Sequence, residues 1–237
     1  MKHEKKIVMP GSVLDRNIRL KASDYIVKSY GRGLVSTLVG VIQRSKDGIE
    51  LIPYKCVYKP KKGDYVIGAV VGYAPNGWII DIGSYTKAFL PAADVMNHKF
   101  DPKKDELSKY LSVGDIVGIK IQEARRIGYL PATIKGSDKD KKYGKIEDYY
   151  IIKVSTTKLP RIIGRKGSMI KLIKQKIDGE LIIAQNGVIL YKGSYENYIL
   201  LKKIINLIVA KTFASGLTDA VAEILNTSKS EAEKRGE

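Results

Sequence analysis

The chain has 237 residues, 44% of them hydrophobic, which is too apolar for a disordered protein and long enough for two or three small domains. Its 42 Lys and Arg exceed its 25 Asp and Glu, so the formal net charge of +17 predicts a polyanionic partner. The single cysteine excludes an internal disulfide, and no apolar stretch has the length to cross a membrane, so we expect a soluble, cytoplasmic protein.

Residues 1–62 consist of short extended segments broken by glycine. Met9-Pro10-Gly11 and Asp47-Gly48 are turn signals. Val35–Ile42 and Ile49–Tyr54 flank the second turn as a predicted hairpin. We therefore predict a small N-terminal β-rich domain.

Residues 63–136 predict a five-stranded barrel of the OB type, because a longer insertion separates the last two strands from the first three. A fragment of a β-sandwich is the competing interpretation, although the segment is short for one. Asp101–Leu111, with proline in its first turn, is predicted to form a surface helix within the insertion. The five predicted strands are Tyr65–Val71, Trp78–Ile82, Ala88–Pro91, Ile116–Ile121 and Pro131–Ile134.

Residues 147–216 have the order βααββα that a KH domain requires, after a polar linker at Lys135–Asp148. Asn186-Gly187 predicts a type I′ turn between the second and third strands. Residues 217–237 are predicted to be a C-terminal helix and a disordered tail. The predicted elements are Tyr149–Val154, Pro160–Ile163, Ser168–Ile177, Leu181–Ala184, Val188–Tyr191 and Tyr195–Ala214. The fold class is thus multidomain α+β.

A Gly-x-x-Gly turn lies between the two predicted helices. Its glycines permit close approach of a polymer backbone, its dibasic pair supplies positive charge, and the next helix adds its N-terminal dipole. The pattern predicts a KH-type loop that grips single-stranded nucleic acid, although Gly-x-x-Gly also occurs by chance in turns. The predicted RNA-binding residues are Gly164, Arg165, Lys166, Gly167, Lys171 and Lys174.

The distribution of charge favours nucleic acid over a generally lysine-rich, solvated surface. Residues 149–213 hold ten Lys and two Arg against three acidic residues, so 12 − 3 gives +9 for this segment. More than half of the net charge of +17 therefore lies on the segment that carries the loop.

The barrel segment resembles the S1 RNA-binding domain, on the strings Asn76-Gly77-Trp78-Ile79-Ile80-Asp81 and Ala88-Phe89-Leu90-Pro91. The resemblance implies base stacking on the second and third strands. Asn76, Ile79 and Pro91 depart from the family, which has aromatic residues or histidine there. The residues predicted to contact RNA on the barrel are Tyr73, Trp78, Lys87, Lys120, Arg125 and Arg126.

The whole chain resembles the RNA-binding cap subunit of the archaeal exosome, the ribosomal-RNA-processing-four type, in which an N-terminal domain, an S1 domain and a KH domain follow in this order. The strings that support the resemblance are Met9-Pro10-Gly11, Gly31-Arg32-Gly33, Tyr58-Lys59-Pro60-Lys61-Lys62-Gly63-Asp64, Trp78-Ile79-Ile80-Asp81 and Lys142-Tyr143-Gly144-Lys145.

The resemblance implies that three copies form a cap on a hexameric ring of RNase PH-like subunits, with the N-terminal domain docked on the ring. The cap would capture single-stranded RNA and thread it into the ring for 3′-to-5′ degradation. We therefore expect no catalytic residue, no metal and no cofactor in this chain. Two alternatives stay open: an enzyme that acts on RNA by itself, and a free-standing RNA-binding protein associated with ribosomes or translation.

Overall fold

The computed structural model describes residues 6–17, 21–22, 25–29, 31–44, 48–96, 98, 100–101, 103–125, 127–138 and 140–210. Its internal contacts divide the chain into two compact units, Met1–Cys56 and Val57–Glu237. The division falls six residues before the predicted boundary at residue 62, and the second unit contains both of the later predicted domains. The predicted C-terminal helix and tail lie outside the described residues.

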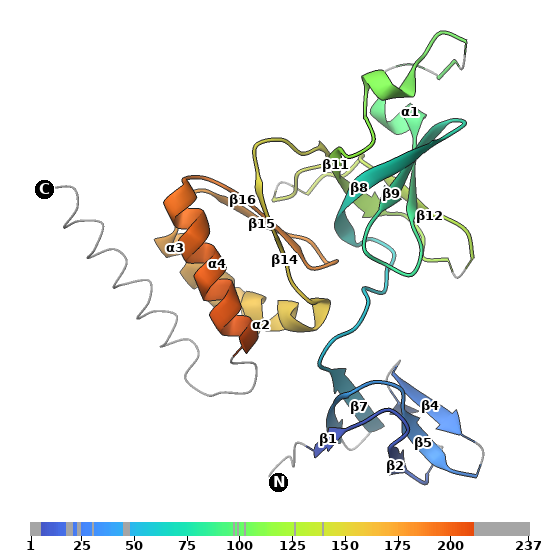
Figure 1. The fold of residues 1–237 in the computed structure, drawn as a ribbon, viewed down its shortest axis with the longest axis vertical. Helices are drawn as coiled ribbons and strands as arrows, with labels where there is room; N and C mark the ends of the chain where they lie inside the picture. Colours follow the sequence, from blue (N-terminus) through green and yellow to red (C-terminus); the bar gives the residue numbers. More distant parts are fainter. Residues whose placement is uncertain are drawn as a thin grey trace, which may run out of the picture. The chain divides into compact units, whose positions relative to one another are not determined.

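The N-terminal unit consists of short strands in two sheets (blue in Figure 1). One sheet has the order β1-β6-β7-β3 and the other β2-β5-β4. The predicted hairpin is confirmed in β6 and β7, which pair antiparallel, whereas Val35 belongs to β5 of the other sheet. The strands are β1 Lys6–Val8, β2 Val13–Asp15, β3 Lys21–Ala22, β4 Ile26–Ser29, β5 Gly33–Ser36, β6 Gly40–Arg44 and β7 Gly48–Pro53.

The first half of the second unit is a closed barrel of five strands. Their order is β12-β10-β9-β8-β11, and the β11–β12 pairing closes it. The β10–β12 pair is parallel and the other pairs are antiparallel. All five predicted strands are confirmed, within a few residues, as β8 Tyr65–Ala74, β9 Gly77–Asp81, β10 Ala88–Pro91, β11 Ile116–Ile121 and β12 Leu130–Thr133.

Three further short elements belong to the barrel. Helix α1, Ala92–Val95, follows β10, and the 3₁₀ turn η1, Leu107–Lys109, lies in the long insertion. Strand β13, Gly144–Lys145, pairs with β11 inside the segment that the sequence predicts to be a linker. That linker prediction is therefore wrong in part, because a strand within it extends the sheet of the barrel.

The predicted surface helix over Asp101–Leu111 is wrong except for its last turn, where η1 forms. The carboxylate of Asp105 accepts hydrogen bonds from the backbone N–H of Asp101 (2.8 Å) and from Nε2 of His98 (2.9 Å). Glu106 is then extended, with φ −109° and ψ 116°, so that only η1 is helical. The N–H of Asp105 donates to the carbonyl of Asp101 (2.8 Å), so one turn forms here, but the extended backbone of Glu106 ends it.

The second half of this unit has the predicted order of strands and helices (yellow to red in Figure 1). Its antiparallel sheet has the order β14-β16-β15. The elements are β14 Tyr150–Lys153, η2 Thr156–Lys158, α2 Leu159–Ile163, η3 Arg165–Gly167, α3 Ser168–Lys176, β15 Glu180–Ile183, β16 Val188–Lys192 and α4 Tyr195–Ala210.

Both faces of this sheet are buried. Ile189 and Tyr191 of β16 pack in a cluster with α2, α3 and α4, whereas Val188 and Leu190 pack with Tyr65 and Ile67 of the barrel. Two buried faces explain why the strands are almost continuously apolar instead of alternating. The barrel and this α/β part therefore share a core.

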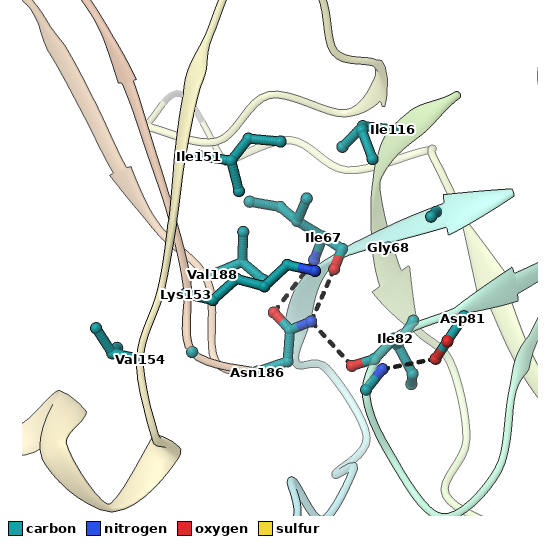
Figure 2. Close-up of a pocket in the computed structure, with 13 residues that line it drawn as sticks. Ile67, Gly68, Asp81, Ile82, Ile116, Ile151, Lys153, Val154, Asn186 and Val188 are labelled. Carbon is teal, nitrogen blue, oxygen red and sulfur yellow. Dashed lines mark hydrogen bonds between the residues drawn. The ribbon is translucent and has the colours of Figure 1, made fainter. Parts of the chain in front are cut away.

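The turn between β15 and β16 joins these two parts directly (Figure 2). Nδ2 of Asn186 donates to the carbonyls of Ile67 (2.7 Å) and Ile82 (3.0 Å), and its Oδ1 accepts from the N–H of Ile67 (3.3 Å). The predicted type I′ turn is wrong, because Gly187 has a positive φ of 85° and Asn186 does not. Only Gly187 has the positive φ that a type I′ turn requires at both central residues, and the side chain of Asn186 points to the barrel.

Among the helices that the structure describes, none is long and apolar enough to cross a membrane.

Candidate nucleic-acid interface

The Gly-x-x-Gly turn connects α2 to α3 and has a tightly defined backbone. The N–H of Gly164 donates to the carbonyl of Pro160 (2.9 Å), and the N–H of Gly167 donates to the carbonyl of Gly164 (3.1 Å). Lys166 has a left-handed conformation, with φ 51° and ψ 27°. These bonds fix the turn, so the two basic side chains project from a preformed scaffold.

The structure places the cations of the turn in solvent. Arg165 and Lys166 are both exposed, and neither forms an ion pair with any residue that the structure describes. Lys171 and Lys174 are also exposed, on the side of α3 opposite the buried Ile173. All four predicted cations are therefore accessible to a polyanion.

The two glycines of the turn differ in what they tolerate. A Cβ on Gly164, which has φ 77° and ψ 171°, would lie 2.6 Å from the backbone nitrogen of Met169. A Cβ on Gly167, at φ 78° and ψ 14°, would meet nothing closer than Ile170 at 3.8 Å. Gly164 is thus required by packing, whereas a Cβ on Gly167 would have room.

Charge around the turn has one sign. Residues 156–177 contain no Asp or Glu and seven basic residues, which are Lys158, Arg161, Arg165, Lys166, Lys171, Lys174 and Lys176. The pKa of Lys158 is lowered, first by burial and second by the charge of Arg161. A phosphate near this cluster would relieve such repulsion between like charges.

The barrel residues predicted to contact RNA are only partly brought together. Hydrogen bonds from Tyr85 to the carbonyl of Arg125 (2.9 Å) and from Leu130 to that of Lys87 (3.0 Å) hold two loops side by side. Lys87 and Arg125 are exposed on these loops, and Arg125 donates from Nε and Nη2 to Oε2 of Glu123 (2.8 and 2.6 Å).

The other barrel candidates lie on other strands. Tyr73 is 44% exposed at the end of β8, and Lys120 is half-buried on β11. Arg126 lies outside the described residues. The predicted set is therefore not one compact site.

The prediction that Trp78 contacts RNA is wrong. Its side chain is fully buried in the barrel core, and its indole N–H donates to the carbonyl of Leu111 (2.9 Å). An aromatic ring that packs on both faces in a core has no face left for a base.

Sequence reasoning missed Phe89 as an aromatic residue on the outer face of the barrel. Phe89 of β10 is half-buried and stands opposite Ile79 of β9, and its ring covers Gly77, whose missing Cβ would lie 3.0 Å from that ring. The signal was the alternation along β10, in which Ala88 and Leu90 point inward. This strand pair thus carries an aromatic ring despite its departures at Asn76, Ile79 and Pro91.

A cavity of about 290 Å³ lies between the barrel and the sheet, beside Asn186 (Figure 2). Its walls include Ile67, Ile151 and Val188, and the Lys153 side chain extends along it. The cavity lies at the interface, or seam, between the barrel and the α/β part.

Three relatives are similar along almost the whole chain. Proteins named exosome complex component Rrp4 are 35% identical in Methanobrevibacter smithii, 34% in Nitrosopumilus maritimus and 31% in Pyrobaculum aerophilum. The matches cover 94%, 95% and 94% of this chain and 71%, 98% and 93% of those proteins.

A solved crystal structure is also similar. It is named as that of a candidate exosome complex RNA-binding protein and has a TM-score of 0.68 at 28% identity, covering 75% of this chain and 99% of the other. No protein-family model matches the chain.

Proposed function

The chain belongs to the Rrp4 family of exosome components, and from this premise we propose that it is a non-catalytic, RNA-binding cap subunit in the cytoplasm. It captures single-stranded RNA and passes it to a hexameric ring of RNase PH-like subunits, on which three copies form a trimeric cap. The ring then degrades or processes the RNA from its 3′ end.

The observation that carries the RNA-binding proposal is the preformed turn at residues 164–167. Arg165 and Lys166 are exposed without carboxylate partners among the described residues, and the flanking segment has seven basic and no acidic residues. The βααββα order around the turn supports its assignment as a KH domain. We propose that the backbone of the RNA passes over Gly167, with Lys171 and Lys174 nearby.

The barrel supports a second part of the proposal. Its closed five-stranded topology is that of an OB-type fold, as S1 domains have. We assign Phe89 to base contact on this face, and Lys87, Lys120 and Arg125 to phosphate contact, with Tyr73 at the margin.

The N-terminal unit supports the proposal that this subunit docks on the ring. Apolar residues lie exposed on both of its sheets: Ile7 (60%) and Ile52 (41%) on one, Val13 (52%) and Val27 (47%) on the other. Apolar strips on a unit of 56 residues suit burial against another protein. We assign this unit to contact with the ring.

Catalysis is assigned to the ring. His98 is exposed and bonded to Asp105, and among the described residues no cluster of three His, Cys, Asp or Glu side chains is placed to hold a metal ion. Incubation of the purified chain with labelled RNA and either phosphate or Mg²⁺ is expected to leave the RNA intact. Efficient degradation would overturn the assignment.

The affinity for RNA should fall steeply as salt is added. A strand held by about 4–8 phosphate contacts gives a log–log slope of several units, because each contact releases a counterion. Fluorescence anisotropy of labelled oligouridine with the full chain, between low and physiological salt, measures this slope. A flat dependence would show that the positive charge serves something other than RNA.

Replacing Ile52 with Lys should abolish assembly with the ring. Ile52 lies on the exposed face of β7, so a lysine there leaves the fold intact but puts a charge into a desolvated interface. Co-purification with co-expressed ring subunits measures assembly. Val113→Lys is the matched control, since Val113 is 56% exposed on the barrel part.

Retention of the ring by Ile52→Lys would contradict the docking assignment. If the wild-type chain itself never co-purifies with a ring, the alternative of a free-standing RNA-binding protein is favoured.

A further inference from the structure

Tyrosine rings form a stack that runs from the core of the α/β part to its surface. The ring of Tyr150 lies between those of Tyr191 and Tyr198, at centroid distances of 6.4 and 4.4 Å and interplanar angles of 21° and 18°. Tyr191 is buried, and its hydroxyl donates to the carbonyl of Asp178 (2.6 Å). Tyr198, at the other end, is half-buried. The stack therefore ends at the surface of α4.

The surface end of the stack continues along one face of α4. Tyr195, Tyr198 and Lys202 follow one another at i, i+3 and i+7 and so share a side of the helix. Tyr195 is 59% exposed, and its centroid lies 6.1 Å from that of Tyr198. The core is formed by other residues of the helix, namely Leu201, Ile204, Ile205 and Ile208. Tyr198 packs against this core as a partly buried residue, whereas Tyr195 lies outside it, with its ring centroid 6.2 Å from that of Tyr150.

Cations border these rings. Nζ of Lys202 lies 5.9 Å from the centroid of Tyr198, and neither Lys202 nor Lys203 forms an ion pair with a residue in the described part of the chain. Two acids lie nearby: Glu180 on β15 accepts a hydrogen bond from the hydroxyl of Tyr149 (2.5 Å), and Glu196 is exposed next to Tyr195 in the first turn of α4. Aromatic faces beside unpaired lysines are the combination with which proteins hold single-stranded nucleic acid.

An aliphatic docking surface is not present here. Of the described residues from 147 to 210, the exposed large hydrophobic side chains are Tyr195 and Ile163, and Ile163 lies on α2. A protein partner would find mainly rings and lysines on this face of α4, whereas a polynucleotide supplies both bases and phosphates. Charge and ring chemistry therefore favour RNA.

The tyrosine face lies at the other end of α3 from the Gly-x-x-Gly turn. The carbonyl of Asp178, just beyond the C-terminal end of α3, accepts from Tyr191 and from Asn197 of α4. The turn precedes the N-terminal end of α3, and nine helical residues span about 13 Å. A loop of the KH type clamps about four nucleotides, so only a longer strand would reach both places.

We propose that Tyr195, Tyr198 and Lys202 form a second contact for single-stranded RNA. A base stacks on the exposed ring of Tyr195, beside the half-buried Tyr198, and Lys202 binds an adjacent phosphate. This inference rests on the proposed function and adds a site to it, so that the α/β part holds a strand at both ends of α3.

The test compares two labelled oligouridines, one of about four nucleotides and one of about twelve, with the full chain. Tyr195→Ala should weaken binding of the longer strand about fivefold to twentyfold, because one stacked base is lost, and leave the shorter one unchanged. Tyr195→Phe keeps the ring and should bind both like the wild type. Lys202→Ala should weaken the longer strand and reduce the salt slope by about one unit.

The possible results distinguish a failure of this second site from a failure of the proposed RNA-binding function. If the wild type binds neither strand, the RNA-binding function itself fails. If Gly167→Asp weakens both strands while Tyr195→Ala changes neither, the loop binds RNA and the tyrosine face does not. Unchanged RNA affinity of Tyr195→Ala together with loss of a protein from the assembled complex would assign this face to a protein contact and overturn the inference.

Discussion

Gly167→Asp should reduce the affinity for single-stranded RNA about tenfold or more, which corresponds to about 1.4 kcal/mol. The new carboxylate would occupy the open space at the turn and repel the phosphate that Arg165 and Lys166 attract. The cost to folding should be about 1 kcal/mol, since aspartate tolerates a left-handed backbone better than most residues. Anisotropy of labelled oligouridine at fixed salt measures the affinity, and urea unfolding measures the stability.

Gly31→Asp is the matched control for this change. Gly31 has nearly the same φ, 74° against 78°, and a Cβ there would have nothing within 4 Å, against Ile170 at 3.8 Å for Gly167, but Gly31 lies in the N-terminal unit. It should cost the same stability and leave RNA affinity unchanged. Equal affinities of the two variants would show that the turn does not contact RNA.

Gly164→Asp is expected to act differently. Its Cβ would collide with the backbone of Met169 in a conformation that is almost confined to glycine, so the turn itself must distort. A loss of RNA binding in this variant would therefore report damage to the turn, and Gly167→Asp is the informative substitution.

Asn186→Ala should lower the free energy of unfolding by about 2–4 kcal/mol. Its amide bonds both the N–H and the carbonyl of Ile67, as a residue of a neighbouring strand would, and also the carbonyl of Ile82. Alanine leaves these groups without their partner at a seam between two packed surfaces (Figure 2). Urea unfolding of the full chain measures the change.

Asn76→Ala is the matched control for Asn186→Ala. Asn76 also precedes a glycine in a turn between paired strands, but its side chain is exposed. Its replacement should change stability by less than about 0.5 kcal/mol. If Asn186→Ala is as mild as Asn76→Ala, the amide does not hold the barrel to the sheet.

Local pattern was enough to predict most elements of the second unit. The five barrel strands and the strand–helix order around residues 164–167 follow from apolar periodicity and from Gly and Asn turns, which act over a few residues. The prediction of a helix over Asp101–Leu111 failed because the backbone becomes extended at Glu106, a break that apolar periodicity does not indicate.

The candidate site divides in the same way. The sequence alone determined that the chain carries a glycine-flanked dibasic turn in a strongly basic segment, because residue identity and spacing fix charge and backbone freedom. Only the tertiary structure decided that Trp78 is buried, that Phe89 faces outward, that Gly164 and Gly167 are not equivalent, and that Asn186 is a bridge rather than a simple turn residue. Each of these properties depends on which other segment of the chain packs against the residue. Contacts between residues far apart in the chain cannot be predicted from a local sequence pattern.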